Sequence, residues 1–137
     1  MVGQDDLEVV AMNAKTPARP RLLLLEDDRA TYTALRGILR LRGWDVLLAT
    51  TIAEARDALE EPLDAAVFDL MLPDGAADGL VEILRTRCPD LPIAITTGVS
   101  DADRLASIHL EGPTVLMRKP ISLPDLLKAI TAPVRSA

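Results

Sequence analysis

The sequence is poor in aromatic residues, which make up 2% of its 137 positions, and it contains a single cysteine. One cysteine, Cys88, cannot form an internal disulfide or a metal cluster by itself, so the composition fits a reducing, cytoplasmic environment. No apolar run approaches the ~20 residues that a membrane-spanning helix needs. The N-terminus has no basic segment leading into an apolar one, which argues against a secretory signal. We therefore expect a cytoplasmic protein that is not associated with a membrane.

The chain also lacks an excess of basic residues. Its net charge is −6, so it does not offer the basic face that direct nucleic-acid binding requires. A hydrophobic content of 49% with 26% charged residues excludes a wholly disordered chain, and the length suits one domain. Pro17 and Pro20 disfavour a helix near the N-terminus. We predict a flexible arm at residues 1–20, one folded domain at 21–132 and a tail at 133–137.

Strand and helix patterns alternate along the predicted domain. Short apolar runs bounded by turn formers predict buried strands at residues 22–25, 44–48, 65–68, 92–96 and 114–117. Helical spacing and capping residues predict helices at residues 31–42, 51–60, 80–87 and 100–109, and a last helix that begins at the cap Ser122. Gly75 and Gly79 predict a mobile loop before the third helix. The alternation is typical of an α/β fold, here a doubly wound five-stranded parallel sheet covered on both faces.

Four of these strands end in residues that carry a charge or a hydroxyl group. These residues are Glu26, Asp27 and Asp28 after the first strand, Asp69 after the third, Thr96 and Thr97 at the fourth, and Arg118 and Lys119 at the fifth. A parallel sheet gathers the carboxyl ends of its strands along one edge, where open α/β sheets bind their ligands. Neighbouring carboxylates repel one another unless a hard cation such as Mg²⁺ lies among them. A carboxylate nucleophile, a metal ion, a lysine and a hydroxyl are together the groups needed for phosphoryl transfer to an aspartate.

The same residues resemble the motif set of the receiver domains of two-component response regulators. Those motifs are an acidic pair after the first strand, Asp-x-x-x-Pro-x-Gly around the phosphoacceptor, Thr or Ser after the fourth strand, and Lys-Pro after the fifth. In this chain they read Glu26-Asp27, Asp69 to Gly75 with Pro73 between them, Thr97-Gly98 and Lys119-Pro120. Each motif is weak alone, but four in order at predicted strand ends are a strong signal. The resemblance, closest in kind to chemotaxis-regulator-like single-domain response regulators, implies a flavodoxin-like (βα)5 fold with strand order 2-1-3-4-5 over residues 21–132.

The resemblance also implies roles for individual residues. Asp69 would accept a phosphoryl group, Lys119 would pair with it, and Thr97 would hydrogen-bond the transferred group. The implied Mg²⁺ ligands are the side chains of Glu26, Asp27 and Asp69 and the backbone carbonyl of Met71. Pro120 would follow a cis peptide bond. Such a protein catalyses its own Mg²⁺-dependent phosphorylation and dephosphorylation and is not a metabolic enzyme.

The implied partners are a sensor histidine kinase or a histidine phosphotransfer protein as the phosphoryl donor. A downstream protein would bind the face made by the fourth helix, the fifth strand and the fifth helix, and the chain would be a monomer or a weak dimer. The family commonly has an aromatic residue three positions before the lysine, where this chain has Leu116. We therefore hypothesise that output depends on backbone shifts in the loop at residues 98–104.

Several alternatives stay open at this stage. Asp28 lies one position beyond the acidic pair and is interpreted as a helix N-cap. Thr96 competes with Thr97 for the role of the hydroxyl that binds the phosphoryl group, and the Gly98 that follows Thr97 favours Thr97. A pseudo-receiver, or adaptor, would keep the fold and bind partners independently of phosphorylation. A phosphatase of the haloacid dehalogenase type is disfavoured because Met71 occupies the place of its second aspartate. A nucleotide-binding domain is disfavoured because the first strand–helix turn has no glycines.

Overall fold

A five-stranded parallel sheet forms the centre of the molecule, in a computed structural model that describes residues 19–98 and 112–131. Its strands are β1 (Arg21–Leu25), β2 (Asp45–Ala49), β3 (Ala65–Asp69), β6 (Ile93–Thr97) and β7 (Thr114–Arg118). The order across the sheet is β2-β1-β3-β6-β7, so the predicted order 2-1-3-4-5 of the long strands is confirmed. The predicted strand boundaries are correct to within one residue.

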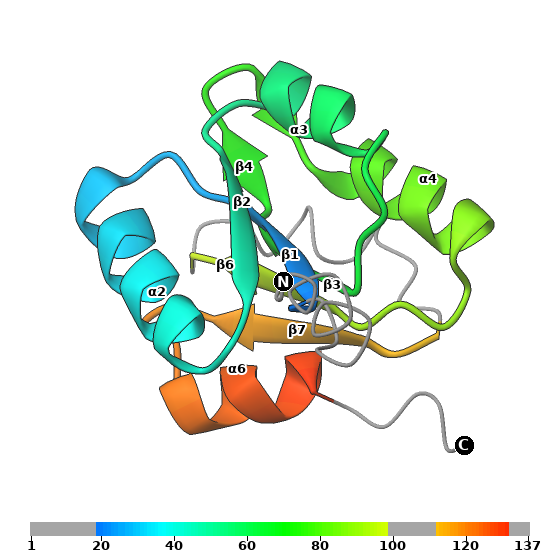
Figure 1. Ribbon diagram of the computed structural model, residues 1–137. Helices are drawn as coiled ribbons and strands as arrows, with labels where there is room; N and C mark the ends of the chain where they lie inside the picture. Colours follow the sequence, from blue (N-terminus) through cyan, green and yellow to red (C-terminus); the bar gives the residue numbers. More distant parts are fainter. Residues whose placement is uncertain (1–18, 99–111, 132–137) are drawn as a thin grey trace, which may run out of the picture.

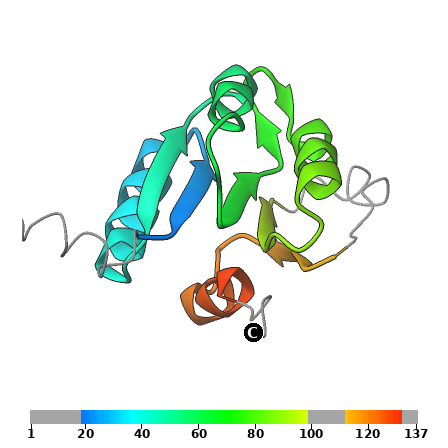
Figure 2. The same ribbon diagram turned by 45° about the vertical axis from the view of Figure 1, so that its right-hand side comes forward.

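The described helices lie on both faces of this sheet. They are α2 (Arg29–Leu41), α3 (Ile52–Ala58), α4 (Asp78–Arg87) and α6 (Leu123–Ile130). Figures 1 and 2 show α2 and α6 on one face and α3 and α4 on the other. The predicted helix at residues 100–109 and the predicted tail lie outside the described residues, as does the predicted arm except for its last two positions.

The leucines of β1 explain why the sheet is buried on both faces. Leu22 and Leu24 pack with α2 and α6, whereas Leu23 and Leu25 pack with α3 and α4, because successive side chains of a strand point to opposite faces. All four are 0% exposed. Burying a leucine side chain contributes about 1.5–3 kcal/mol to stability, so this strand anchors both layers of the core.

Helix starts follow the capping residues in the sequence. The side chains of Asp28, Thr51 and Ser122 accept hydrogen bonds from the amides of Thr31, Glu54 and Asp125. Each bond satisfies an amide that the first turn of a helix leaves without a partner. The interpretation of Asp28 as an N-cap is therefore confirmed.

A short hairpin follows the central strand β3. Its strands β4 (Met71–Leu72) and β5 (Gly75–Ala76) pair antiparallel. Gly75 has φ 143°, a conformation open mainly to glycine, which allows the chain to reverse there. The predicted loop up to Gly79 is wrong, because α4 begins at Asp78 and includes Gly79.

The described helices are too short or too polar to cross a membrane.

Candidate functional site

The carboxyl ends of β1, β3 and β7 bring together two carboxylates and one ammonium group. Lys119 Nζ lies 3.1 Å from Asp69 Oδ2 and 3.3 Å from Glu26 Oε1. Glu26 and Asp69 are only 2% and 7% exposed, so their charges are shielded from water. A buried carboxylate needs a cation or a hydrogen-bond donor, and Lys119 supplies both to each of them.

A third carboxylate completes an acidic cluster. One side-chain oxygen from each of Glu26, Asp27 and Asp69 lies within 4.8 Å of the other two, and Asp27 is exposed. A set of oxygen donors gathered in this way suits a hard divalent cation that keeps part of its water shell. The residues therefore fit a metal ion of the Mg²⁺ type, as the sequence predicted.

The pKa values in the cluster reflect burial and the facing charges. Burial raises the pKa of Glu26, although the Asp28 amide and the charge of Lys119 act in the opposite direction. The Asp28 amide donates to Glu26 Oε2 at 3.1 Å. Burial lowers the pKa of Lys119, but its bonds to Asp69 and the charges of Asp69 and Glu26 outweigh that effect and raise it. The pKa values of Glu26 and Lys119 are therefore both raised, each toward its protonated form.

Both threonines at the end of β6 are buried, but they hold different positions. Thr96 is the register partner of Asp69 in the parallel ladder, and its hydroxyl lies 3.5 Å from the Phe68 carbonyl. Thr97 comes one residue later, and its hydroxyl donates to the Gly98 carbonyl at 3.2 Å. The Thr97 carbonyl in turn accepts the Lys119 amide at 2.8 Å, which ties β6 to the residue that pairs with Asp69. The choice of Thr97 as the switch hydroxyl stays a prediction.

The other residues singled out in the sequence also lie near this edge. The Met71 amide donates to Asp69 Oδ1 at 3.4 Å, and the Met71 side chain is exposed. The peptide bond between Lys119 and Pro120 is cis, which confirms that prediction.

Asp74 is a site-adjacent residue whose contact the sequence analysis missed. Asp74 lies at the hairpin tip. Its carboxylate accepts hydrogen bonds from the amides of Ile52 at 2.8 Å and Ala53 at 3.2 Å, at the start of α3. The bond from Ile52 is the main cause of a lowered pKa of Asp74. The Pro-Asp-Gly motif indicated a turn, but no local pattern indicates that the turn meets a helix more than twenty residues earlier in the chain.

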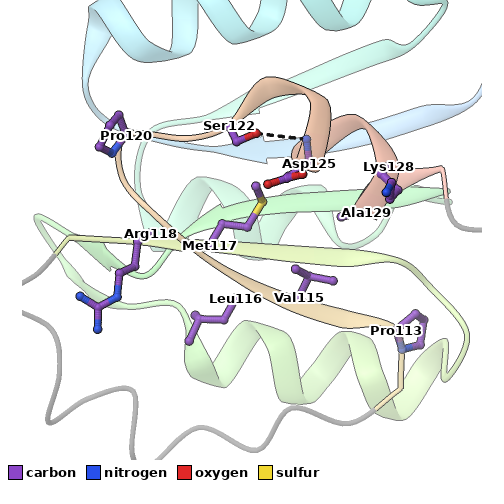
Figure 3. A pocket seen from close by; sticks show the side chains of 10 residues that line it. All are labelled: Pro113, Val115, Leu116, Met117, Arg118, Pro120, Ser122, Asp125, Lys128 and Ala129. Atoms are coloured by element: carbon purple, nitrogen blue, oxygen red, sulfur yellow. Dashed lines mark hydrogen bonds between the residues drawn. The ribbon is translucent and has the colours of Figure 1, made fainter.

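An apolar groove lies between β7 and α6. Its volume is about 670 Å³, and Figure 3 shows the lining side chains, which come from these two elements and the segments beside them. Val115 is 41% exposed there, and Leu116, which points to the other face of the strand, packs partly against the core under α3 and α4. Arg118 and Lys128 add positive charge, and Asp125 adds one negative charge.

Comparison with known proteins gives a consistent result. The family model "Response regulator receiver domain" matches residues 22–131. The photosynthetic apparatus regulatory protein RegA of Rhodobacter capsulatus is 34% identical over 113 residues, which are 81% of this chain and 61% of that protein. The response regulator MprA of Mycolicibacterium vanbaalenii is 38% identical over 120 residues, which are 84% of this chain and 50% of that protein. The chain thus spans about half to three fifths of the length of these curated relatives.

The same likeness appears in three dimensions. The non-phosphorylated HemR receiver domain of Leptospira biflexa superimposes with a TM-score of 0.69 at 32% identity, covering 85% of this chain and 94% of that one.

Proposed function

Because the chain belongs to the response regulator receiver domain family, we propose that it is a signalling module switched by phosphorylation of Asp69. The observation that carries the proposal is the meeting of Asp69 with two further carboxylates and Lys119 at one edge of the sheet. Members of the family exchange phosphoryl groups with histidine kinases or phosphotransfer proteins and act on downstream effectors. The donor proposed for this chain is a phosphohistidine on such a partner.

In the proposed reaction the nucleophile is a carboxylate oxygen of Asp69. That oxygen attacks the phosphorus of the phosphohistidine, a new O–P bond forms as the P–N bond breaks, and the histidine leaves with the electron pair. Lys119 Nζ, 3.1 Å from Asp69 Oδ2, is placed to hold an oxygen of the incoming group by charge and hydrogen bond. Thr97, at the end of the adjacent strand, is the proposed hydroxyl donor to that group.

The residues that would hold Mg²⁺ are the side chains of Glu26, Asp27 and Asp69 and the backbone carbonyl of Met71. When bound, Mg²⁺ supplies positive charge that offsets the clustered carboxylates and the phosphoryl oxygens. The transferred phosphoryl group carries about 1.5 to 2 negative charges at neutral pH, so the site needs this positive charge in addition to that of Lys119.

Incubation with acetyl phosphate and Mg²⁺, followed by intact mass measurement, tests the proposal. We expect an adduct of about 80 Da, the mass of one phosphoryl group. The adduct should disappear in Asp69→Asn and persist in the matched variant Asp57→Asn, which removes an exposed carboxylate from α3. An unmodified wild-type chain would contradict the proposal and favour the adaptor alternative.

We further propose the groove between β7 and α6 as part of the surface that binds the downstream protein. The exposed Val115 and the neighbouring Arg118 and Lys128 suit an apolar side chain flanked by acidic groups on the partner. If the groove responds to the switch, phosphorylation should shift the NMR methyl signals of Val115 and Leu116. Shifts confined to residues around Asp69 would contradict a coupled groove.

A further inference from the structure

Asp74 joins the hairpin after the phosphoacceptor to the start of α3. Asp74 Oδ1 accepts the Ile52 amide at 2.8 Å, and Oδ2 accepts the Ala53 amide at 3.2 Å. These are the first two residues of α3, and first-turn amides have no partner within their own helix. One exposed carboxylate thus makes two charge-assisted hydrogen bonds to a distant element.

The start of α3 already has caps from its own segment. Thr51 Oγ1 accepts the Glu54 amide at 3.1 Å, and Glu54 Oε1 accepts the Thr50 amide at 2.7 Å. Asp74 accepts hydrogen bonds from the Ile52 and Ala53 amides, which these two local caps do not bind. Thr51 and Asp74 therefore serve the same helix end, but only Asp74 also belongs to the hairpin.

The opposite end of the hairpin is fixed to the sheet. The Leu70 amide donates to the Thr96 carbonyl at 2.9 Å, and the Ala77 amide donates to the Leu70 carbonyl at 2.8 Å. Between these bonds and the tip, the two strands share only two residue pairs. An isolated hairpin with so short a ladder is only marginally stable. The hairpin therefore depends on the hydrogen bonds at both of its ends.

We propose that Asp74 is a positioning residue, which holds in place the hairpin that carries Met71 and its backbone carbonyl. This inference rests on the metal site proposed above, in which that carbonyl is a ligand. Met71 lies in β4, between the sheet anchor at Leu70 and the tip anchor at Asp74. Freeing the tip lets the backbone at Met71 move, which weakens metal binding although every carboxylate of the cluster is intact.

Binding of Mg²⁺ alone, measured by calorimetry, separates this role from simple helix capping. We expect Asp74→Ala to weaken the Mg²⁺ affinity by roughly 3- to 10-fold, at or below the low end of effects seen when partners of metal ligands are removed. The matched variant Thr51→Ala removes a cap from the same helix and should leave the affinity within about twofold of wild type. Asp74→Asn, which keeps one acceptor oxygen, should recover part of the loss.

A second measurement needs no metal. Hydrogen exchange of the Ala77 amide, which closes the hairpin onto Leu70, should be faster in Asp74→Ala than in Thr51→Ala when Mg²⁺ is absent. Equal affinities and equal exchange rates in the two variants would overturn the positioning role and leave Asp74 as a cap. A wild-type chain that binds no Mg²⁺ would instead overturn the metal site, and with it the role of Asp74 toward Met71.

Discussion

Lys119 is the residue that allows two carboxylates to lie side by side out of water. Its ammonium group contacts both Glu26 and Asp69, and about a third of its side chain remains exposed. The raised pKa of Glu26 shows that this compensation is incomplete, since burial still disfavours the charged acid. The charge of Asp69 raises the pKa of Glu26 in the same direction as burial, so a cation bound there would offset both effects.

Lys119→Met should make stability depend more strongly on pH. The pKa of Glu26 is raised in the folded state, so its contribution to stability is complete below the ordinary value of 4.5 and is lost as the pH rises through the folded value. Removing the ammonium group raises this pKa further. At pH 7 without metal we expect the free energy of unfolding to fall by about 1–3 kcal/mol, which lies between the values for exposed and for fully buried ion pairs.

Chemical denaturation in EDTA from pH 7 to pH 4.5 checks this expectation. The difference in unfolding free energy between wild type and variant should narrow as the pH falls, because a protonated Glu26 no longer needs the lysine. Lys128→Met, which removes an exposed cation from α6, serves as the control and should show little pH dependence. A difference in unfolding free energy that stays constant or widens toward low pH would contradict the role of Lys119 as the partner of the buried Glu26.

At the scale of elements, patterns within one segment predicted most of the fold. Continuous apolar runs located the strands, and the caps Asp28, Thr51 and Ser122 located three helix starts. The motif spacing also predicted the meeting of Asp69 and Lys119, because a parallel sheet gathers its strand ends. The hairpin was missed, since two residue pairs leave no periodic pattern and Gly79 indicated a loop where α4 has already begun. The bond from Asp74 to α3 depends on packing between distant segments, which no local pattern contains.

Two glycine-to-alanine variants should change stability in opposite directions. Gly37 lies in α2, and a Cβ there would meet nothing within 4 Å, so Gly37→Ala should stabilise by about 0.5–1 kcal/mol through helix propensity. Gly112 has φ +63°, and a Cβ there would lie 2.8 Å from the Pro89 carbonyl oxygen. Gly112→Ala should therefore destabilise by about 1–3 kcal/mol. Urea denaturation measures both, and a stabilised Gly112→Ala would show that the backbone at Gly112 relaxes freely.

For the molecule as a whole, the sheet topology turns distant sequence positions into one site. Residues 26, 69 and 119 lie far apart in the chain, yet the order β2-β1-β3-β6-β7 places β3 in the middle, with β1 on one side and β6 on the other. Asp69 thus has acids on one flank and the threonines of β6 on the other. Among the residues that the structure describes, Glu26, Asp27 and Asp69 form a cluster of acids at this edge, so metal binding there should stabilise the whole domain.

Millimolar Mg²⁺ should raise the melting temperature by binding only the folded state. At a concentration one hundred times the dissociation constant the stabilisation is about 2.7 kcal/mol, which corresponds to a rise of roughly 10 °C for a domain of this size. Asp27→Asn removes an exposed proposed ligand without disturbing the buried pair and should lose most of the rise, whereas Asp57→Asn should keep it. NaCl at equal ionic strength controls for general screening of the net charge, which acts on all acids alike. A rise that NaCl reproduces, or that Asp27→Asn retains in full, would mean that the cation binds elsewhere or only screens charge.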